Sequence, residues 1–431
     1  MKIQILMCLL AVGAFAGIVP NLDLSEGDSV YLSSGAKNTY LTDNFLYTYV
    51  SDTSFSFHVG EGPSKLFVTW MTTPYEAWAN NIATTCGHSE VPLSDFVLLA
   101  SANSTTGFDG DWDTLAVIAD SPVSSRGILV DFEGKSWLRF SMKTAVSVYG
   151  VRFFDASNGA EDTWFFLGTS ITQMAFNGNA VDTTFEWQVN ALVPTNTPAT
   201  VFGGIGCVNS TEVVNNISTY MTHGGSVHFW AIEMGTNDAW GGGDGNLSTY
   251  ISNMQEIIDS AKSLGIIPVI ARIIATDSSV AGWQINPKYL TSLDSLVNVN
   301  GLYSGPDFYT YFYNHPEELN TDGVHPNATG AASMQRLWAE AAAPIYSGPG
   351  AIFQKVKINR PEIEVQGNKI RIDNLNQENS TVALFSVMGK SLNSYKVNKN
   401  SIMLVPKVPV GHYILMVKNG NHSVTVPVYL K

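Results

Sequence analysis

Apolar residues in the first part of the chain fall into short runs. Between about Ser29 and Ala160, runs such as KLFVTWM, DFVLLAS, RGILVDF and SVYGVRFF are separated by clusters of Gly, Asp, Ser and Asn. Short β-type runs punctuated by turn residues are typical of antiparallel strands in two packed sheets. We therefore predict a β-sandwich over residues 20–160.

The pattern changes at Thr163. From there to about Tyr346, apolar runs such as TWFFL, TVFGGIG, SVHFWAIEM and IIPVIARII are each followed by a helical pattern. Parallel strands covered on both faces are continuously apolar, and crossover helices must connect them. We predict a doubly wound α/β domain over residues 163–346, whose active site lies beyond the carboxyl ends of the strands.

Residues 351–431 form a third predicted unit. The runs EIEVQ, KIRIDNL, TVALFSV and HYILMVK alternate like the strands of a small antiparallel sandwich. This unit has 11 Lys and Arg against 4 Asp and Glu, a net charge of +7, in a chain whose total is -14. The remainder is thus strongly acidic and shows no basic stripe, which excludes nucleic acid as an expected partner.

The first residues, MKIQILMCLLAVGAFAGIVP, place one Lys before an apolar run that ends in small residues. This pattern predicts a signal peptide over residues 1–16 and a secreted or cell-surface protein. The run is shorter than the ~20 residues a membrane span needs, so no membrane insertion is expected after its removal. Cys86 and Cys207 would then remain. They could pair, but they fall in different predicted domains, and we expect free buried thiols.

A candidate nucleophile follows the apolar run that ends at Leu167. In Gly168-Thr169-Ser170, the serine falls between a predicted strand and a predicted helix. Such a turn projects the hydroxyl above the sheet and leaves backbone N–H groups of the first helical turn without internal partners. In isolation the tripeptide is equally typical of a helix cap.

A candidate base lies in Asp322-Gly323-Val324-His325, near the end of the α/β region. A carboxylate bonded to one ring nitrogen fixes the tautomer, so that the other nitrogen can accept a proton from serine. By itself the motif also fits a turn before a helix. A metal site with His315 lacks a third ligand at a recognisable spacing, and neither a metal nor a cofactor is expected.

Two further loops follow predicted strands. Asn237, after the run VHFWAIEM, can donate its side-chain amide to a developing oxyanion. The glycines of FGGIGC allow backbone N–H groups of this loop to approach a ligand closely. Each loop alone is also compatible with an ordinary turn.

The order Ser, Gly, Asn, Asp/His within one α/β region resembles the SGNH, or GDSL-like, hydrolase family over roughly residues 163–345. The resemblance implies a flavodoxin-like, three-layer α/β/α domain with Ser170 as nucleophile, completed by Asp322 and His325. It also implies an oxyanion hole formed by Ser170, Gly206 or Cys207, and Asn237. One departure is Thr169, which stands where the family's Gly-Asp-Ser has Asp.

The flanking units carry looser resemblances. LLASANSTTGFDGDWDTLAV and SWLRFSMK resemble galactose-binding-like jelly rolls. VMGKSL and PKVPVGHYILMVKNG resemble C-terminal sorting domains of type IX secretion, which would make secretion machinery a partner, although a generic immunoglobulin-like module fits equally well.

A jelly roll joined to an SGNH-like domain resembles esterases that remove acetyl groups from plant polysaccharides. Trp240, after the Asn237 motif, could stack on a sugar or plug the sheet. We predict a secreted, acetylxylan-type serine esterase acting on acetylated polysaccharide. The alternatives are a lysophospholipase or thioesterase with the same triad, and a non-catalytic carbohydrate-binding protein.

Overall fold

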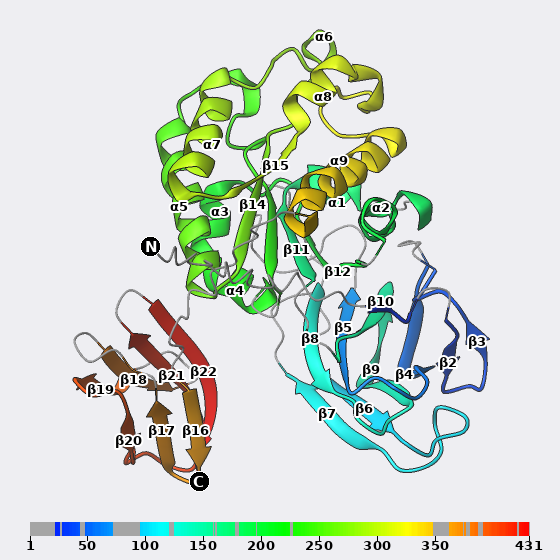
Figure 1. Cartoon of the computed structure of the whole chain (residues 1–431), viewed down its shortest axis with the longest axis vertical. Coiled ribbons are helices and arrows are strands. Elements are labelled where there is room, and N and C mark those ends of the chain that lie inside the picture. The colour runs from blue at the N-terminus through cyan, green and yellow to red at the C-terminus, as the bar shows by residue number, and fades with distance from the viewer. Residues whose placement is uncertain are drawn as a thin grey trace, which may run out of the picture. The chain divides into compact units, whose positions relative to one another are not determined.

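The computed structural model (Figure 1) describes residues 22–25, 28–43, 48–71, 95–119, 125–157, 159, 162–176, 181–194, 196–224, 227–347, 362–373, 375, 380–386, 391–419 and 422–430. The predicted signal peptide and Cys86 lie outside these residues. The chain divides into two compact units, Met1–Lys262 with Ile266–Ala351, and Ser263–Gly265 with Ile352–Lys431.

The N-terminal part of the first unit contains two antiparallel sheets, with strand orders β1-β10-β5-β8 and β3-β2-β4-β9-β6-β7. Their strands are β1 (Leu22–Asp23), β2 (Val30–Leu32), β3 (Lys37–Asn38), β4 (Val50–His58), β5 (Lys65–Met71), β6 (Phe96–Ser101), β7 (Asp113–Ile118), β8 (Ser125–Asp131), β9 (Trp137–Val148) and β10 (Gly150–Asp155). One hydrophobic core joins the two sheets, because Trp70 of β5 and Phe153 of β10 belong to the same buried cluster as Phe140 of β9.

A parallel sheet follows, with the order β12-β11-β13-β14-β15. Its strands are β11 (Thr163–Gly168), β12 (Ala199–Gly204), β13 (Phe229–Glu233), β14 (Ile267–Arg272) and β15 (Tyr303–Asp307). Numbered along the chain within this sheet, the order is 2-1-3-4-5, the flavodoxin-like arrangement in which ligands bind where the strand order reverses. The prediction of a doubly wound parallel sheet is therefore confirmed.

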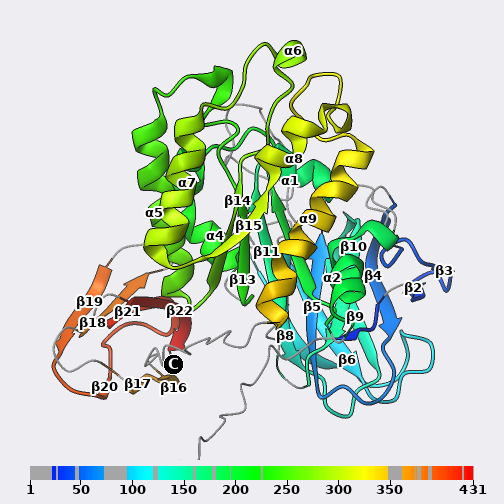
Figure 2. The ribbon, with the colours of Figure 1, turned by 45° about the horizontal axis from the view of Figure 1, so that its top comes forward.

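Helices cover both faces of this sheet (Figure 2). One face carries α1 (Ser170–Ala175), α2 (Phe185–Leu192) and α9 (Ala328–Ser347), and the other carries α3 (Ser210–Asn215), α4 (Ile217–Gly224), α5 (Leu247–Ser263) and α7 (Pro287–Asn300). The shorter elements are α6 (Ser278–Ala281), α8 (Phe308–Asn314), η2 (Val181–Thr183), η3 (Trp240–Gly242) and η4 (Pro316–Glu318). None of the helices in the described residues combines the length and the hydropathy that crossing a membrane demands.

Local sequence sets the helix boundaries. In α7, the Asn286 side chain accepts a hydrogen bond from the N–H of Lys288, and Pro287 stands in the first turn, where its missing N–H removes no helical bond. Gly301 ends the helix in the left-handed conformation. Because the strands between these helices are parallel, their carboxyl ends and the loops after them lie at one edge of the sheet.

The N-terminal sheets and the α/β region meet within the first unit. The Arg152 guanidinium of β10 forms an ion pair with the Glu186 carboxylate of α2, and both side chains are largely buried. Thr200 of β12 also donates its hydroxyl to Glu186. A buried ion pair of this kind would leave an uncompensated charge if either partner were removed, so the two regions are coupled here.

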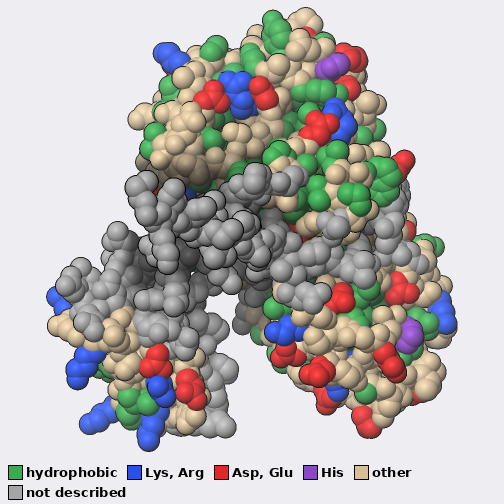
Figure 3. All heavy atoms as spheres, in the orientation of Figure 1, with side chains coloured by type: hydrophobic (Ala, Val, Ile, Leu, Met, Phe, Trp, Pro, Cys, Tyr) green, Lys and Arg blue, Asp and Glu red, His purple; other side chains and the backbone are tan. Residues whose placement is uncertain are grey.

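The C-terminal unit contains two antiparallel sheets with the orders β16-β17-β20 and β19-β18-β21-β22. Its strands are β16 (Glu362–Gln366), β17 (Lys369–Asp373), β18 (Ser380–Ser386), β19 (Ser391–Val397), β20 (Ile402–Leu404), β21 (Gly411–Asn419) and β22 (His422–Leu430). Ile370, Leu384 and Leu415 lie in its separate buried core. Lys and Arg side chains are prominent on its visible surface (Figure 3), as its net charge predicts.

Candidate active site

Ser170 begins α1 immediately after β11 ends at Gly168. Thr169 is the helix cap, and its hydroxyl accepts a hydrogen bond from the N–H of Ile171. A Cβ at Gly168 would lie 2.0 Å from the Thr172 hydroxyl, so only glycine allows the first turn of α1 to fold so closely onto the strand. The serine is therefore held by a tight turn at the carboxyl end of a buried strand.

The His325 ring lies between Ser170 and Asp322. Its Nε2 is 2.8 Å from Oγ of Ser170, and its Nδ1 is 2.6 Å from Oδ2 of Asp322. With Asp322 ionised, Nδ1 carries the ring proton, and Nε2 is left to accept the serine proton. The three side chains that the sequence predicted to act together are thus joined by hydrogen bonds.

The turn that carries Asp322 and His325 is held by its own backbone. Asp322 Oδ1 accepts the N–H groups of Val324 and His325 at 2.9 and 3.1 Å. Partial burial opposes ionisation of Asp322, but these bonds and the His325 side chain together hold the pKa of Asp322 below its ordinary value. The carboxylate therefore stays ionised, as an acceptor for the imidazole must.

Asn237 follows β13 and faces the loop after β12. Its Nδ2 donates to the carbonyl of Val208 at 2.7 Å. The same loop is tied to the serine turn, because the N–H of Ile205 donates to the carbonyl of Gly168 at 3.0 Å. The amide nitrogen of Asn237, the loop of Gly206 and Cys207, and the Ser170 turn are thus neighbouring parts of one edge of the sheet.

Cys207 differs from the sequence prediction. It is disulfide-bonded, so the expectation of a free buried thiol is wrong for this residue. It also has φ of 62°, the left-handed region that side chains rarely adopt, and no other described residue except glycine does so. Such backbone strain concentrates at functional sites, where it aims particular groups.

Trp240 lies in η3 with 57% of its surface exposed. Its ring centroid is 5.0 Å from that of Trp283, at an interplanar angle of 51°. It therefore does not plug the sheet, which was one of the two roles left open for it. Trp283 could not be found from the sequence, because it stands in a loop 43 residues further along the chain with no motif around it.

Glu233 was also missed. It is the last residue of β13 and is 1% exposed, and its Oε2 accepts hydrogen bonds from the hydroxyls of Thr169 and Thr172. The available indication was a lone acidic residue inside the apolar run VHFWAIEM. A carboxyl in such a run has to find partners or stay neutral.

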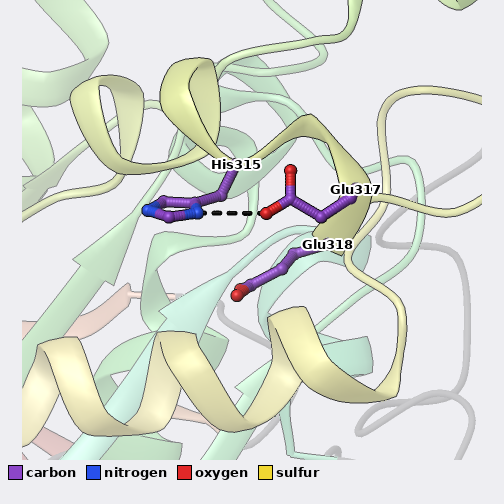
Figure 4. A group of neighbouring side chains, drawn as sticks. All are labelled: His315, Glu317 and Glu318. Carbon is purple, nitrogen blue, oxygen red and sulfur yellow. Dashed lines mark hydrogen bonds and ion pairs between the residues drawn. The ribbon is translucent and has the colours of Figure 1, made fainter.

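His315, Glu317 and Glu318 lie side by side at η4 (Figure 4). Their ligand atoms are within 4.8 Å of one another, and Nδ1 of His315 is 3.1 Å from Oε1 of Glu317. The sequence shows no third ligand for a site with His315 at a recognisable spacing, whereas the structure places two carboxylates beside this histidine. Since exposed acidic groups commonly gather without an ion, this arrangement alone does not define a metal centre.

Comparison with known proteins gave matches among solved structures alone. No family model matches the chain, and no curated protein does. Protein YXIM from Bacillus subtilis is 12% identical with a TM-score of 0.39, over 67% of this chain and 79% of that one.

A lipase/acylhydrolase from Enterococcus faecalis (17% identity, TM-score 0.35) and the acetyl xylan esterase Axe2 from Geobacillus stearothermophilus (16%, 0.32) each match 42% of this chain. The matches cover 95% and 93% of those two chains. At such scores and identities, the likenesses carry no weight for the activity of this chain.

Proposed function

We propose that the protein is a serine esterase of the SGNH type. The observation that carries this proposal is the continuous hydrogen-bonded path from Asp322 through His325 to Ser170. Asp322 is an ionised acceptor, His325 has one basic ring nitrogen, and Ser170 has a hydroxyl at the carboxyl end of an inner strand of the sheet.

The path supports acyl transfer in two stages. Ser170 Oγ attacks the ester carbonyl carbon while its proton passes to Nε2 of His325, and the resulting tetrahedral intermediate expels the alcohol, which takes that proton. Water then attacks the acyl-enzyme, giving its proton to His325, and the carboxylic acid leaves as Ser170 regains a proton. Asp322 holds the ring and stabilises the imidazolium throughout.

The oxyanion of each tetrahedral intermediate needs donors aimed at it in advance. We assign this role to the backbone N–H of Ser170, the backbone N–H of Gly206 or Cys207, and the side-chain amide of Asn237. An amide nitrogen has two hydrogens, and the bond to the Val208 carbonyl engages one of them. That bond orients the amide and leaves the second hydrogen for the substrate.

For the substrate we propose an acetylated polysaccharide. Exposed aromatic rings stack on the apolar faces of sugars, and the exposed Trp240 pairs with the half-buried Trp283 beside the loop of Asn237. The N–H of Asp277 donates a hydrogen bond to the carbonyl of Gly323. The hydroxyl of the preceding residue, Thr276, donates one to the carbonyl of Trp283. The pair is therefore linked to the turn that carries His325.

The flanking regions fit a secreted enzyme. We propose that residues 1–16 direct export, that residues 20–160 form a jelly roll, and that the catalytic domain spans 163–346. We further propose that residues 351–431 are a module for sorting by secretion machinery or for attachment. The protein would then act outside the cell or at its surface, on polysaccharide or oligosaccharide.

Acetate release tests the proposal. Protein lacking residues 1–16 is incubated with acetylated xylan, with acetylated monosaccharides, and with long-chain acyl esters and thioesters. Release from the acetylated carbohydrates alone supports the proposal, preference for long acyl chains replaces it with the lysophospholipase or thioesterase alternative, and hydrolysis of nothing leaves a carbohydrate-binding protein.

Trp240→Ala and Trp283→Ala test the choice of polymer. Each should raise KM for acetylated xylan while leaving hydrolysis of 4-nitrophenyl acetate unchanged, because the small ester does not reach the aromatic pair. Trp187→Ala, an exposed tryptophan on α2, is the matched control. Equal effects on both substrates would remove the aromatic pair from polysaccharide binding.

A further inference from the structure

A buried carboxyl group lies directly beneath the nucleophile turn. Glu233 ends β13, where it is paired in register with Gly168, the residue that ends β11. Every other residue of β13 is apolar, and Glu233 is 1% exposed. Burying an ionisable group at this depth is unfavourable unless its bonds compensate for lost water, so its contacts require an explanation.

Those contacts are made to residues before and after Ser170 in the chain. Glu233 Oε2 accepts hydrogen bonds from the N–H and hydroxyl of Thr169 at 3.3 and 3.1 Å, and from the Thr172 hydroxyl at 3.0 Å. Thr169 precedes the nucleophile and Thr172 follows it by two residues. One oxygen atom of β13 thus collects three donors from the turn that presents Ser170.

The second oxygen of Glu233 is buried without a hydrogen-bond partner among the described residues. Burial raises the pKa of Glu233, although the bonds from Thr169 and Thr172 oppose that rise. The three donors on Oε2 offset part of the cost of removing the carboxyl group from water.

Thr169 occupies the position before Ser170, and the carboxyl group beside it belongs to Glu233 on β13. The Gly-Asp-Ser pattern that the chain otherwise resembles would put a carboxylate at position 169, but that residue is 0% exposed and its hydroxyl bonds Glu233. An aspartate at position 169 would place a second carboxyl group against Glu233 in a buried site. Two adjacent carboxyl groups away from water cannot both be ionised.

We propose that Glu233 is a positioning residue for the esterase reaction: its carboxyl holds the Thr169–Thr172 turn so that Oγ of Ser170 faces His325. This inference rests on the proposed function. It predicts that loss of the acceptor lowers kcat, because the nucleophile is misplaced, and leaves KM nearly unchanged, because Glu233 touches no substrate.

The first test compares Glu233→Gln with Glu233→Met, using 4-nitrophenyl acetate. Glutamine keeps an acceptor oxygen, and methionine has similar volume without one. We expect Glu233→Gln to keep kcat within a few-fold of wild type, and Glu233→Met to lose about 10²-fold, as for a small displacement of reacting atoms. Equal kcat in the two variants, or a loss confined to KM, would overturn the proposal.

A gentler change and a matched control separate positioning from stability. Thr172→Val removes one donor at nearly constant shape and should lower kcat by less than Glu233→Met does. Asp162→Asn alters another buried carboxyl with three side-chain donors, before β11, and should leave kcat per folded molecule unchanged. If Asp162→Asn lowers kcat as much as Glu233→Met, the effect is general destabilisation and the proposal fails.

Substitution at both positions tests the exchange of carboxyl groups. Thr169→Asp alone should lower kcat, and adding Glu233→Val should restore part of it, because one carboxyl then remains beneath the turn. If the double variant is no better than Thr169→Asp, the two positions do not share this role.

Hydrogen exchange gives a readout that does not need turnover. The amides of Thr169 and Ile171 should exchange faster in Glu233→Met than in Glu233→Gln. If wild type hydrolyses no ester, the proposed function fails, but this comparison still decides whether Glu233 holds the turn. Unchanged exchange in Glu233→Met would overturn the positioning role whatever the activity.

Discussion

Ser170 and His325 are 155 residues apart in the chain, and their Oγ and Nε2 atoms are 2.8 Å apart in the structure. The short turn before α1 presents one of them and the turn before α9 presents the other. β11 lies between β12 and β13, where the strand order of the sheet reverses, and the turn after its carboxyl end presents Ser170 at the edge where ligands bind in such sheets. This single contact has consequences that can be measured.

Ser170→Ala and His325→Ala should each lower kcat/KM for 4-nitrophenyl acetate by several orders of magnitude, because each removes a group that moves the proton. His315→Ala is the matched control, since this histidine contacts Glu317 and not the serine. A chelator should leave the rate unchanged. Retained activity in Ser170→Ala, or loss on chelation that added metal restores, would point to a metal-activated water.

Asp322→Asn should lower kcat by about 10⁴-fold, as an amide stabilises the wrong tautomer of the imidazole. Asp277→Asn, which changes a helix-capping aspartate on the adjoining loop, should have little effect. A rate for Asp322→Asn close to that of wild type would mean that the carboxylate does not orient His325.

The wild-type rate should fall as the pH is lowered, because His325 must be neutral to accept the serine proton. Hydrogen bonds hold the pKa of Asp322 below its ordinary value, so Asp322 stays ionised while the imidazole becomes protonated. The acid limb of kcat/KM should therefore follow a single titration. Two overlapping titrations there would show that Asp322 changes its charge as well.

Asn237→Ala should lower kcat by about 10²- to 10³-fold, the effect of removing one oxyanion donor. Asn237→Asp should be as poor, because a carboxylate offers acceptors in place of the donor. Asn314→Ala provides the control, since its amide also donates to a main-chain carbonyl but on the exposed surface of α8. An unchanged kcat in Asn237→Ala would exclude the side chain from the oxyanion hole.

Asp162 should make stability depend on pH. Complete burial raises its pKa to about 6, although Tyr346, Asn196 and Trp164 donate hydrogen bonds to it. A carboxyl with a raised pKa in the folded state stabilises the fold below its unfolded pKa, and this contribution is lost as the pH rises to about 6. The change is on the order of 3 kcal/mol for such a shift.

Urea unfolding at pH 4 and pH 7 measures this effect. In wild type the free energy of unfolding should be lower at pH 7 than at pH 4. Asp162→Asn should reduce this difference, whereas Asp182→Asn, which changes an exposed carboxylate, should leave it as in wild type. If both variants match wild type, Asp162 does not titrate in this range.

The sequence alone indicated the types of element and the chemistry of the loops. Continuous apolar runs followed by helical patterns predicted the parallel sheet, because strands covered on both faces leave no polar alternation. Ser170, Asn237, Asp322 and His325 could be chosen because each follows a predicted strand or precedes a helix, and these positions meet at one edge in any doubly wound sheet. These predictions depend on the local hydrophobic pattern and on the order of strands and helices, and both can be taken from the sequence.

Tertiary structure alone decided which side chains touch. The contacts between Glu233 and Thr169 and between Trp240 and Trp283 join segments that no local pattern relates. Side-chain contacts at such separations depend on strand register, helix packing and loop path, which are set by the close packing of the whole interior. The sequence places Glu233 in an apolar run, but only the folded chain shows that its carboxyl group is buried beneath the turn of Ser170.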